Sequence, residues 1–339
     1  MKLYCGIDLH GNNNVISIID EKDGVMFEKR MANELPMVRQ ALKPYQDELV
    51  GIVVESTYNW YWLVDGLMDD GYKLHLANPA AIQQYDGLKF SDDKSDARWL
   101  AHMLRLGILP EGYIYPKANR QVRDLLRKRS QLVRYRVSNL LSVSNLIARN
   151  QGLTVKSDHL LQLKEEDISA LMEEDNLALA ANANLAVLHC VNEQIKAIEK
   201  VVKDKTKLRP EFQMLKTVPG IGDILALNIA LETGDIGRFP TVGDFSSYCR
   251  TVKSERISNG KKKGKGNAKS GNKYLAWAFI EAADFTVRYN PSARKFYQRK
   301  SAKRKAVVAR KALANKLARA CYYIMRDRVP FNNERLFTT

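Results

Sequence analysis

The sequence predicts a mixed α/β region at the N-terminus, followed by two regions that are almost entirely helical. Short β-rich runs alternate with helical spacing up to about residue 116. Near-heptad apolar spacing continues to about residue 209, and helices separated by Gly- and Lys-rich segments complete the chain. We therefore expect three domains, comprising residues 1–116, 117–209 and 210–339.

The N-terminal region begins with three strand-like runs, residues 3–10, 15–20 and 24–31, the first two separated by a Gly-Asn-Asn-Asn turn. The segments that follow are expected to be a helix at 35–45, a buried strand at 51–55, a helix at 58–70, a strand at 73–76 and a helix opening at Pro79. Three meandering strands followed by β–α alternation is the order of a ribonuclease H-like fold. Actin-like ATPases share this beginning.

The central region predicts two long helices. Residues 117–149 contain nine Lys and Arg residues and one acid, with apolar residues at near-heptad spacing, and residues 177–207 repeat that spacing. Such a pair predicts an antiparallel coiled-coil arm or a dimerisation element. Two ordinary bundle helices would give the same pattern.

The last region combines glycine turns with basic helices. Residues 217–222 (TVPGIG) resemble a helix-hairpin-helix turn that can hold a phosphate; on its own this is a weak signal, and the alternative is a glycine turn between packed helices. Residues 259–273 are rich in Gly and Lys and predict a mobile loop. Helices are expected at 274–289 and 302–326.

The distribution of charge indicates a polyanionic partner. The chain has a formal net charge of +16, but residues 1–116 carry −6 and residues 250–328 carry +19. A long basic segment mixed with loops fits a nucleic acid better than a membrane surface. The start of the chain is not a signal peptide, and no apolar run is long enough to cross a bilayer, so we expect a cytoplasmic protein. The four scattered cysteines predict reduced, buried thiols.

Four carboxylates occupy positions that the predicted fold would bring together. Asp8 lies within the first strand, Glu55 ends the buried run GIVVE, and Asp93 and Asp96 lie three residues apart at the start of a helix. Neighbouring first and fourth strands, crossed by that helix, would make a repulsive cluster that needs cations, and hard oxygen ligands select Mg²⁺. Two such ions can clamp both reacting oxygens of a phosphodiester. Alternatively, Asp93 and Asp96 only stabilise the helix N-terminus; Asp92 faces another direction.

The motifs GIDLH, VVEST and DKSDAR, in this order and spacing, resemble the D-E-D-D signature of the transposases of insertion-sequence family 110, relatives of the Piv DNA invertases. The resemblance continues through TVPGIG and RFPTVGDFSSYCR to KSERISNG and AKSGNKYL. It implies a RuvC-like N-terminal domain, a helical linker and a C-terminal transposase domain. It also implies that Asp8, Glu55, Asp93 and Asp96 bind the metal.

The resemblance further implies a serine nucleophile, and the matching position is Ser258. Family members often have Ser-Gly there, whereas this chain has Ser-Asn-Gly; Ser254 and Ser270 are the other candidates. A phosphoserine ester would preserve the energy of the phosphodiester, so strands could be rejoined without ATP. Arg256 and the lysines at 261–263 could stabilise the charge that develops at phosphorus.

Together these features predict a Mg²⁺-dependent DNA transposase or site-specific recombinase. The resemblance implies an element-encoded noncoding RNA that pairs with donor and target DNA. It also supports a composite site in a dimer or tetramer. The main alternative is a RuvC-like structure-specific DNA endonuclease without a serine nucleophile. A non-catalytic nucleic-acid scaffold is a further alternative, and so is an actin-fold ATPase, although the sequence lacks that fold's second phosphate loop and adenosine motif.

Overall fold

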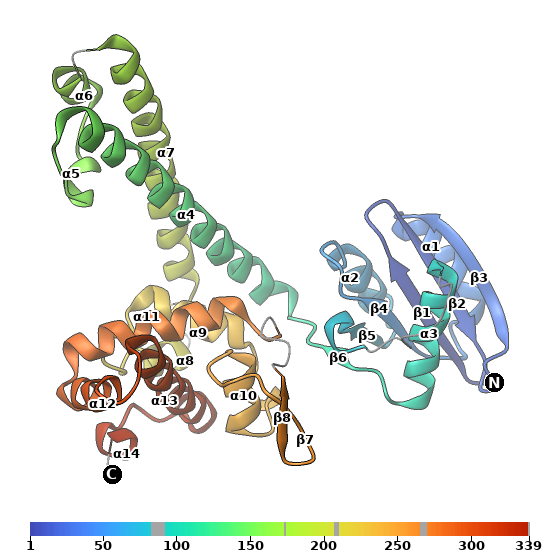
Figure 1. Ribbon diagram of the computed structural model, residues 1–339. Helices are drawn as coiled ribbons and strands as arrows, with labels where there is room; N and C mark the ends of the chain where they lie inside the picture. The colour runs from blue at the N-terminus through green and yellow to red at the C-terminus, as the bar shows by residue number, and fades with distance from the viewer. Residues whose placement is uncertain (83–91, 173, 207–209, 265–269, 338–339) are drawn as a thin grey trace. The chain divides into compact units, whose positions relative to one another are not determined.

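The computed structural model describes residues 1–82, 92–172, 174–206, 210–264 and 270–337. The chain divides into two compact units, Met1–Lys117 and Ala118–Thr339. The first is a mixed α/β unit and the second is mostly helical, as the sequence predicts (Figure 1). The further division of the helical part at residue 209 stays a prediction.

A six-stranded sheet forms the centre of the first unit, in the order β3-β2-β1-β4-β5-β6. Its strands are β1 (Leu3–Leu9), β2 (Asn13–Ile19), β3 (Val25–Ala32), β4 (Leu49–Glu55), β5 (Leu74–Ala77) and β6 (Glu111–Gly112). The first three strands form the expected antiparallel meander, and β1 pairs in parallel with β4. The expected adjacency of the first and fourth strands is therefore confirmed.

Helices cover both faces of this sheet (Figure 1). They are α1 (Leu35–Leu42), α2 (Tyr61–Asp69) and α3 (Asp93–Leu106), with short 3-10 turns η1 (Lys43–Tyr45) and η2 (Pro79–Ala81). Because side chains alternate along a strand, Ile52 and Val54 of β4 pack in one core with α1 and α2, whereas Val53 packs with α3. The helix expected to open at Pro79 is only the three-residue η2, and the residues that follow it, 83–91, lie outside the described part.

Helix α3 lies unusually close to β1 because residue 6 is glycine. A Cβ atom on Gly6 would lie 2.0 Å from the carbonyl oxygen of Ala97 and 2.8 Å from the amide nitrogen of Ala101. Ion pairs fix the outer side of the helix: Arg98 pairs with Glu28 of β3, and Arg105 pairs with Asp23 at a distance of 2.7 Å. Helix α3 is thereby held against the sheet.

Two long antiparallel helices form an arm in the second unit (Figure 1). They are α4 (Lys117–Gln151) and α7 (Asp175–Thr206), joined through the short α5 (Ser157–Leu160) and α6 (Glu165–Leu171). Arg129 of α4 pairs with Glu199 of α7 at 2.7 Å. Not every apolar residue of the heptad-like pattern is covered, since Val137 and Leu141 are 46% and 57% exposed. The two helices are confirmed, and their coiled-coil character stays a prediction.

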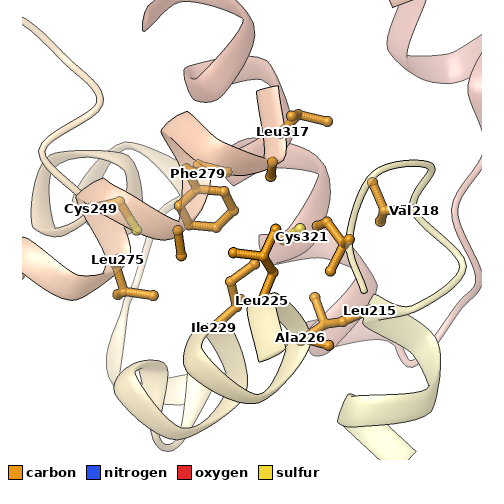
Figure 2. Close-up of a cluster of buried hydrophobic side chains, with 14 of the residues drawn as sticks. Leu215, Val218, Leu225, Ala226, Ile229, Cys249, Leu275, Phe279, Leu317 and Cys321 are labelled. Atoms are coloured by element: carbon orange, nitrogen blue, oxygen red, sulfur yellow. The ribbon is translucent and has the colours of Figure 1, made fainter. Parts of the chain in front are cut away.

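The C-terminal helices surround one apolar core (Figure 2). They are α8 (Pro210–Leu215), α9 (Asp223–Thr233), α10 (Val242–Tyr248), α11 (Lys273–Tyr289), α12 (Pro291–Ser301), α13 (Ala306–Asp327) and α14 (Asn333–Phe337), with a 3-10 turn η3 (Ile236–Arg238). Figure 2 shows Leu225 and Ile229 of α9 beside Phe279 of α11 and Cys321 of α13. The expected helix at 302–326 begins later, at Ala306, and α12 precedes it.

The TVPGIG segment is a turn packed against α11. Gly220 has φ +93°, and a Cβ there would lie 2.5 Å from the amide nitrogen of Thr286, whose hydroxyl donates to the Pro219 carbonyl at 2.7 Å. Asp223, which pairs with Lys203 and with Lys216, follows in the first turn of α9, so this helix N-terminus already has a carboxylate beside it. The geometry therefore favours a packed glycine turn over a phosphate-binding turn.

Two further expectations require correction. Residues 259–264, expected to be part of a mobile loop, form a turn and the strand β8 (Lys261–Gly264), which pairs with β7 (Arg256–Ser258). The thiols of Cys5, Cys249 and Cys321 are buried as expected, but Cys190 is exposed. Among the described helices, none is long and apolar enough to cross a membrane.

Candidate active site

The carboxylates of Asp8, Glu55, Asp93 and Asp96 gather at one end of the first unit's sheet. Asp8 and Glu55 face α3 because they alternate with residues that face α1 and α2. Asp8 is only 2% exposed, and the carboxyl of Glu55 lies close enough to it to raise its pKa. Single ligand atoms of Asp8, His10 and Asp93 lie within 4.8 Å of one another.

This crowding changes the acidity of Asp8. Burial raises the pKa of the Asp8 carboxyl to about 7, and the hydrogen bond and negative charge of Glu55 and the charge of Asp96 add to the rise. His10 opposes it. At neutral pH a proton therefore partly neutralises the cluster in the absence of a cation. A divalent cation would neutralise the cluster more completely.

His10 is a member of this cluster that the sequence analysis did not assign to the site. Its Nε2 lies 3.2 Å from Asp8 Oδ2 and 3.3 Å from Asp93 Oδ2. The amides of Asn33 and Asn59 each donate to the His10 carbonyl at 3.0 Å, which fixes the turn after β1. The available signal was spacing: in an extended chain, residue 10 lies on the same side as residue 8.

The start of α3 divides its acidic residues between two roles. Asp92 is the helix cap: its carboxylate accepts from the Ser95 amide at 2.8 Å, and this bond lowers the pKa of the Asp92 carboxyl. Asp93 instead faces the cluster and accepts a hydrogen bond from Arg30 of β3. The structure thus separates Asp92 from the carboxylates that gather around Asp8.

A pocket of about 300 Å³ opens beside the carboxylates. Glu55 and Asp96 line it together with Trp99 and Leu100 of α3 and with Pro79 and Ile82. Both acids are half-buried, so their oxygens remain accessible to a bound group. Two of the four carboxylates, Glu55 and Asp96, therefore line this pocket.

The candidate serines belong to the second unit, whereas the four carboxylates belong to the first. Ser258 is exposed at the end of β7, where it pairs with Lys261 across a two-residue Asn-Gly turn. Asn259 and Gly260 have φ values of +49° and +67°, as a tight hairpin requires. Ser254 is half-buried before β7, and Ser270 is exposed.

The ends of the segment that carries these serines are tied together. The Arg250 guanidinium donates to the carbonyls of Ser270 at 3.0 Å and Gly271 at 2.7 Å. The amide of Asn272 donates to the Tyr248 carbonyl at 2.6 Å. The hairpin of β7 and β8 therefore extends from a closed base.

Comparisons with known proteins agree with this geometry. Residues 5–149 match the sequence profile of the DEDD transposases of the IS110 group, and residues 212–298 match that of the transposase IS116/IS110/IS902 family. The transposase for insertion sequence element IS1111A of Coxiella burnetii is 23% identical over 338 residues, covering 96% of this chain and 87% of the relative. A protein assigned to transposase family 20 in Pseudomonas aeruginosa is 26% identical over 278 residues, covering 78% of this chain and 80% of its own length.

The two profile matches cover the carboxylate cluster at one end and the serine hairpin at the other, and both name the same group of transposases. The chain therefore belongs to the IS110 family of DEDD transposases.

Proposed function

We propose that the protein is the transposase of an insertion sequence that cuts and rejoins DNA strands. In this proposal Asp8, Glu55, Asp93 and Asp96 hold Mg²⁺, and Ser258 forms a transient ester with the cut strand. The observation that carries the proposal is the convergence of acidic side chains on the buried carboxyl of Asp8. The sheet order, with β1 beside β4, supports a ribonuclease H-like fold for this unit.

The residues present fit a divalent cation. Asp8 Oδ2 and His10 Nε2 are buried and lie 3.2 Å apart, and within the described part of the chain neither atom makes a contact with hydrogen-bond geometry. Several carboxylates around such an atom are unfavourable without a positive charge, and carboxylate oxygens are the ligands that Mg²⁺ prefers. Asp8 is best placed to contact the ion, because Asp93 and Glu55 both lie beside it.

When bound, the cation would act as a Lewis acid that polarises the scissile phosphate. The protein's own contribution is to position the surrounding groups. Asn33 and Asn59 fix the turn that carries His10, while Arg30 and His10 hold the carboxylate of Asp93. The pocket beside Glu55 and Asp96 would admit the DNA backbone.

The serine step conserves the bond energy needed for rejoining. The Ser258 oxygen forms a bond to phosphorus as the bond from phosphorus to one deoxyribose oxygen breaks, and the serine proton passes to a nearby base. The released deoxyribose oxygen takes up a proton. A deoxyribose hydroxyl of the new partner strand then attacks the ester and restores the serine. The exposed position of Ser258 beside Lys261 supports this role.

Charge and exposed apolar surface support the proposed partners. The net charge of +19 on residues 250–328 suits the backbones of DNA and of a structured guide RNA, whose involvement rests on the family resemblance. Exposed apolar side chains along the arm, among them Val137 and Leu141 of α4 and Leu179 of α7, support contact between protomers in a dimer or tetramer.

The nucleophile can be tested with suicide DNA substrates that trap a covalent protein–DNA adduct. We expect Ser258→Ala to abolish the adduct, because a methyl group cannot form the ester. The rate of strand exchange should fall at least about 1,000-fold. Ser254→Ala is the matched control, with a serine removed four residues away, and should retain both. Strand cleavage by Ser258→Ala without an adduct would instead favour a structure-specific endonuclease.

A further inference from the structure

A cavity of about 630 Å³ lies between α13 and the C-terminal segment that contains α14. None of its lining residues belongs to the serine hairpin. The side chains that matter for its chemistry are Lys316, Arg319, Tyr323, Arg326, Phe331 and Arg335. Among the described lining residues, four are cations and one, Asp327, is an acid. Asp327 already pairs with Arg326 at 2.7 Å. The cavity is therefore strongly positive.

The positive charges are packed closely enough to oppose one another. Burial lowers the pKa of the Lys316 ammonium, and the charges of Arg319, Arg299 and Lys300 lower it further. Lys316 Nζ donates to the Leu336 carbonyl at 2.7 Å, which holds it in this position. Bound anionic groups would relieve this repulsion.

The outer wall of the cavity is fixed by contacts to the rest of the unit. The Phe331 amide donates to the Thr217 hydroxyl at 2.8 Å, and the Asn290 amide donates to the Asn333 side chain at 2.7 Å. These bonds and the Lys316 contact tie three points of the C-terminal segment to α12, α13 and the turn after α8. The cavity is thus a built feature of the unit.

An aromatic side chain completes the site. Tyr323 is 39% exposed, and its ring packs edge-on against Tyr322, with centroids 5.3 Å apart. The Arg326 guanidinium lies 4.9 Å from the centre of the Tyr323 ring. Stacking surfaces beside cations are the combination that recognises unpaired nucleotides, whose bases stack while their phosphates pair with Lys and Arg.

We propose that this cavity binds one unpaired nucleotide of a nucleic acid, with the base against Tyr323 and the flanking phosphates against Arg319 and Arg335. Its volume falls within the range of about 300–1,000 Å³ that is typical of sites for small organic groups. A base stacked within a continuous duplex cannot enter such a cavity. The site uses neither the carboxylates nor Ser258, so it goes beyond the proposed strand-transfer chemistry.

The test uses the full chain in EDTA and measures fluorescence anisotropy with duplexes that are fully paired or carry one unpaired nucleotide. DNA and RNA versions of each duplex distinguish the source of the nucleotide. For DNA, for RNA or for both, we expect the wild type to bind the duplex with one unpaired nucleotide at least about 5-fold more tightly than the fully paired duplex. The reason is that only an unpaired base can stack on Tyr323. Tyr323→Leu should abolish this preference, and Tyr323→Trp should retain it.

Arg304→Ala provides the matched charge control, since Arg304 is exposed in the loop between α12 and α13 and does not line the cavity. It should weaken binding to both duplexes equally and leave the preference intact. Melting temperatures verify that each variant is folded. Equal binding of the two duplex forms by the wild type, or an unchanged preference in Tyr323→Leu, would overturn the proposal.

Discussion

At the scale of single residues, Asp8 shows most clearly how this protein places stability and function in opposition. Its carboxyl is buried beside Glu55 and Asp96, so its ionised form is unfavourable in the folded, metal-free protein. A structural aspartate would gain well-aligned hydrogen-bond donors, whereas Asp8 Oδ2 has only His10 Nε2 at 3.2 Å, without hydrogen-bond geometry, among the described residues. Such an arrangement is characteristic of a group kept for its chemistry.

The raised pKa predicts a particular dependence of stability on pH. Because the folded-state pKa of Asp8, about 7, exceeds the unfolded value of about 3.9, the native state binds the extra proton. The stabilising effect of that proton is complete near pH 4 and is lost as the pH rises through 7. Asp8→Asn removes this loss, so it should stabilise the metal-free protein by on the order of 2 kcal/mol at pH 8.

Thermal unfolding in EDTA between pH 4.5 and 8 checks this prediction. The difference in melting temperature between Asp8→Asn and the wild type should be small at the acidic end and should grow with pH. Taking the difference between the two melting temperatures cancels the titration of other carboxyls. One of these is Glu28, and its ion pair with Arg98 lowers the pKa of its carboxyl. A wild type more stable than Asp8→Asn at pH 8 in EDTA would argue against a strained carboxylate.

At the scale of elements, the contact between β1 and α3 determines the geometry of the site. Gly6→Ala would place a methyl group against the backbone of α3, which must then move away from Asp8. We expect a loss of about 1–3 kcal/mol of stability from overpacking. We also expect the metal affinity to fall at least about 10-fold, as measured by titration calorimetry.

Gly112→Ala is the matched control in the same unit. A Cβ there would lie 3.4 Å or more from its neighbours, which is ordinary contact. It should therefore leave both stability and metal affinity nearly unchanged. Normal metal binding by Gly6→Ala would show that the close packing of α3 does not position the carboxylates.

The elements also show which parts of the site could be predicted from sequence. The proximity of Asp8, Glu55 and the two α3 acids could be predicted because strand alternation and helical spacing place them by local rules. His10 was missed because it follows the strand, where tertiary bonds from Asn33 and Asn59 decide its position. Lysine-rich composition obscured the hairpin at β7 and β8, although the Asn259-Gly260 pair is a strong hairpin signal.

A buried ion pair connects the arm to the C-terminal core. Arg127 of α4 donates two hydrogen bonds of 2.7 Å to Glu232 of α9, which is 1% exposed and also accepts from Asn272 at the start of α11. Glu232→Ala leaves Arg127 without this partner, so it should cost about 3–5 kcal/mol. Urea denaturation measures the effect.

The matched control for this pair is Glu193→Ala, which removes an exposed glutamate paired with Lys196 on α7. Because exposed pairs contribute little, its cost should stay below about 1 kcal/mol. Equal costs for the two variants would show that the buried pair does not secure the base of the arm.

At the scale of the whole molecule, sequence patterns identified the order of a mixed α/β unit followed by helices, because hydrophobic periodicity reports local structure well. They were weaker where packing decides the outcome. Val137 and Leu141 fit the heptad-like pattern of α4 but remain exposed, and the proline at 79 opens only one 3-10 turn.

A metal centre at Asp8 can be tested by the binding of Mn²⁺, a paramagnetic substitute for Mg²⁺, to the full chain at pH 8. We expect electron paramagnetic resonance to detect Mn²⁺ bound to the wild type, and we expect Mg²⁺ to displace it. Asp8→Asn should weaken binding at least about 100-fold, whereas the control Asp69→Asn, an exposed acid of α2, should not change it. Equal Mn²⁺ affinity for the wild type and Asp8→Asn would contradict a metal centre at Asp8.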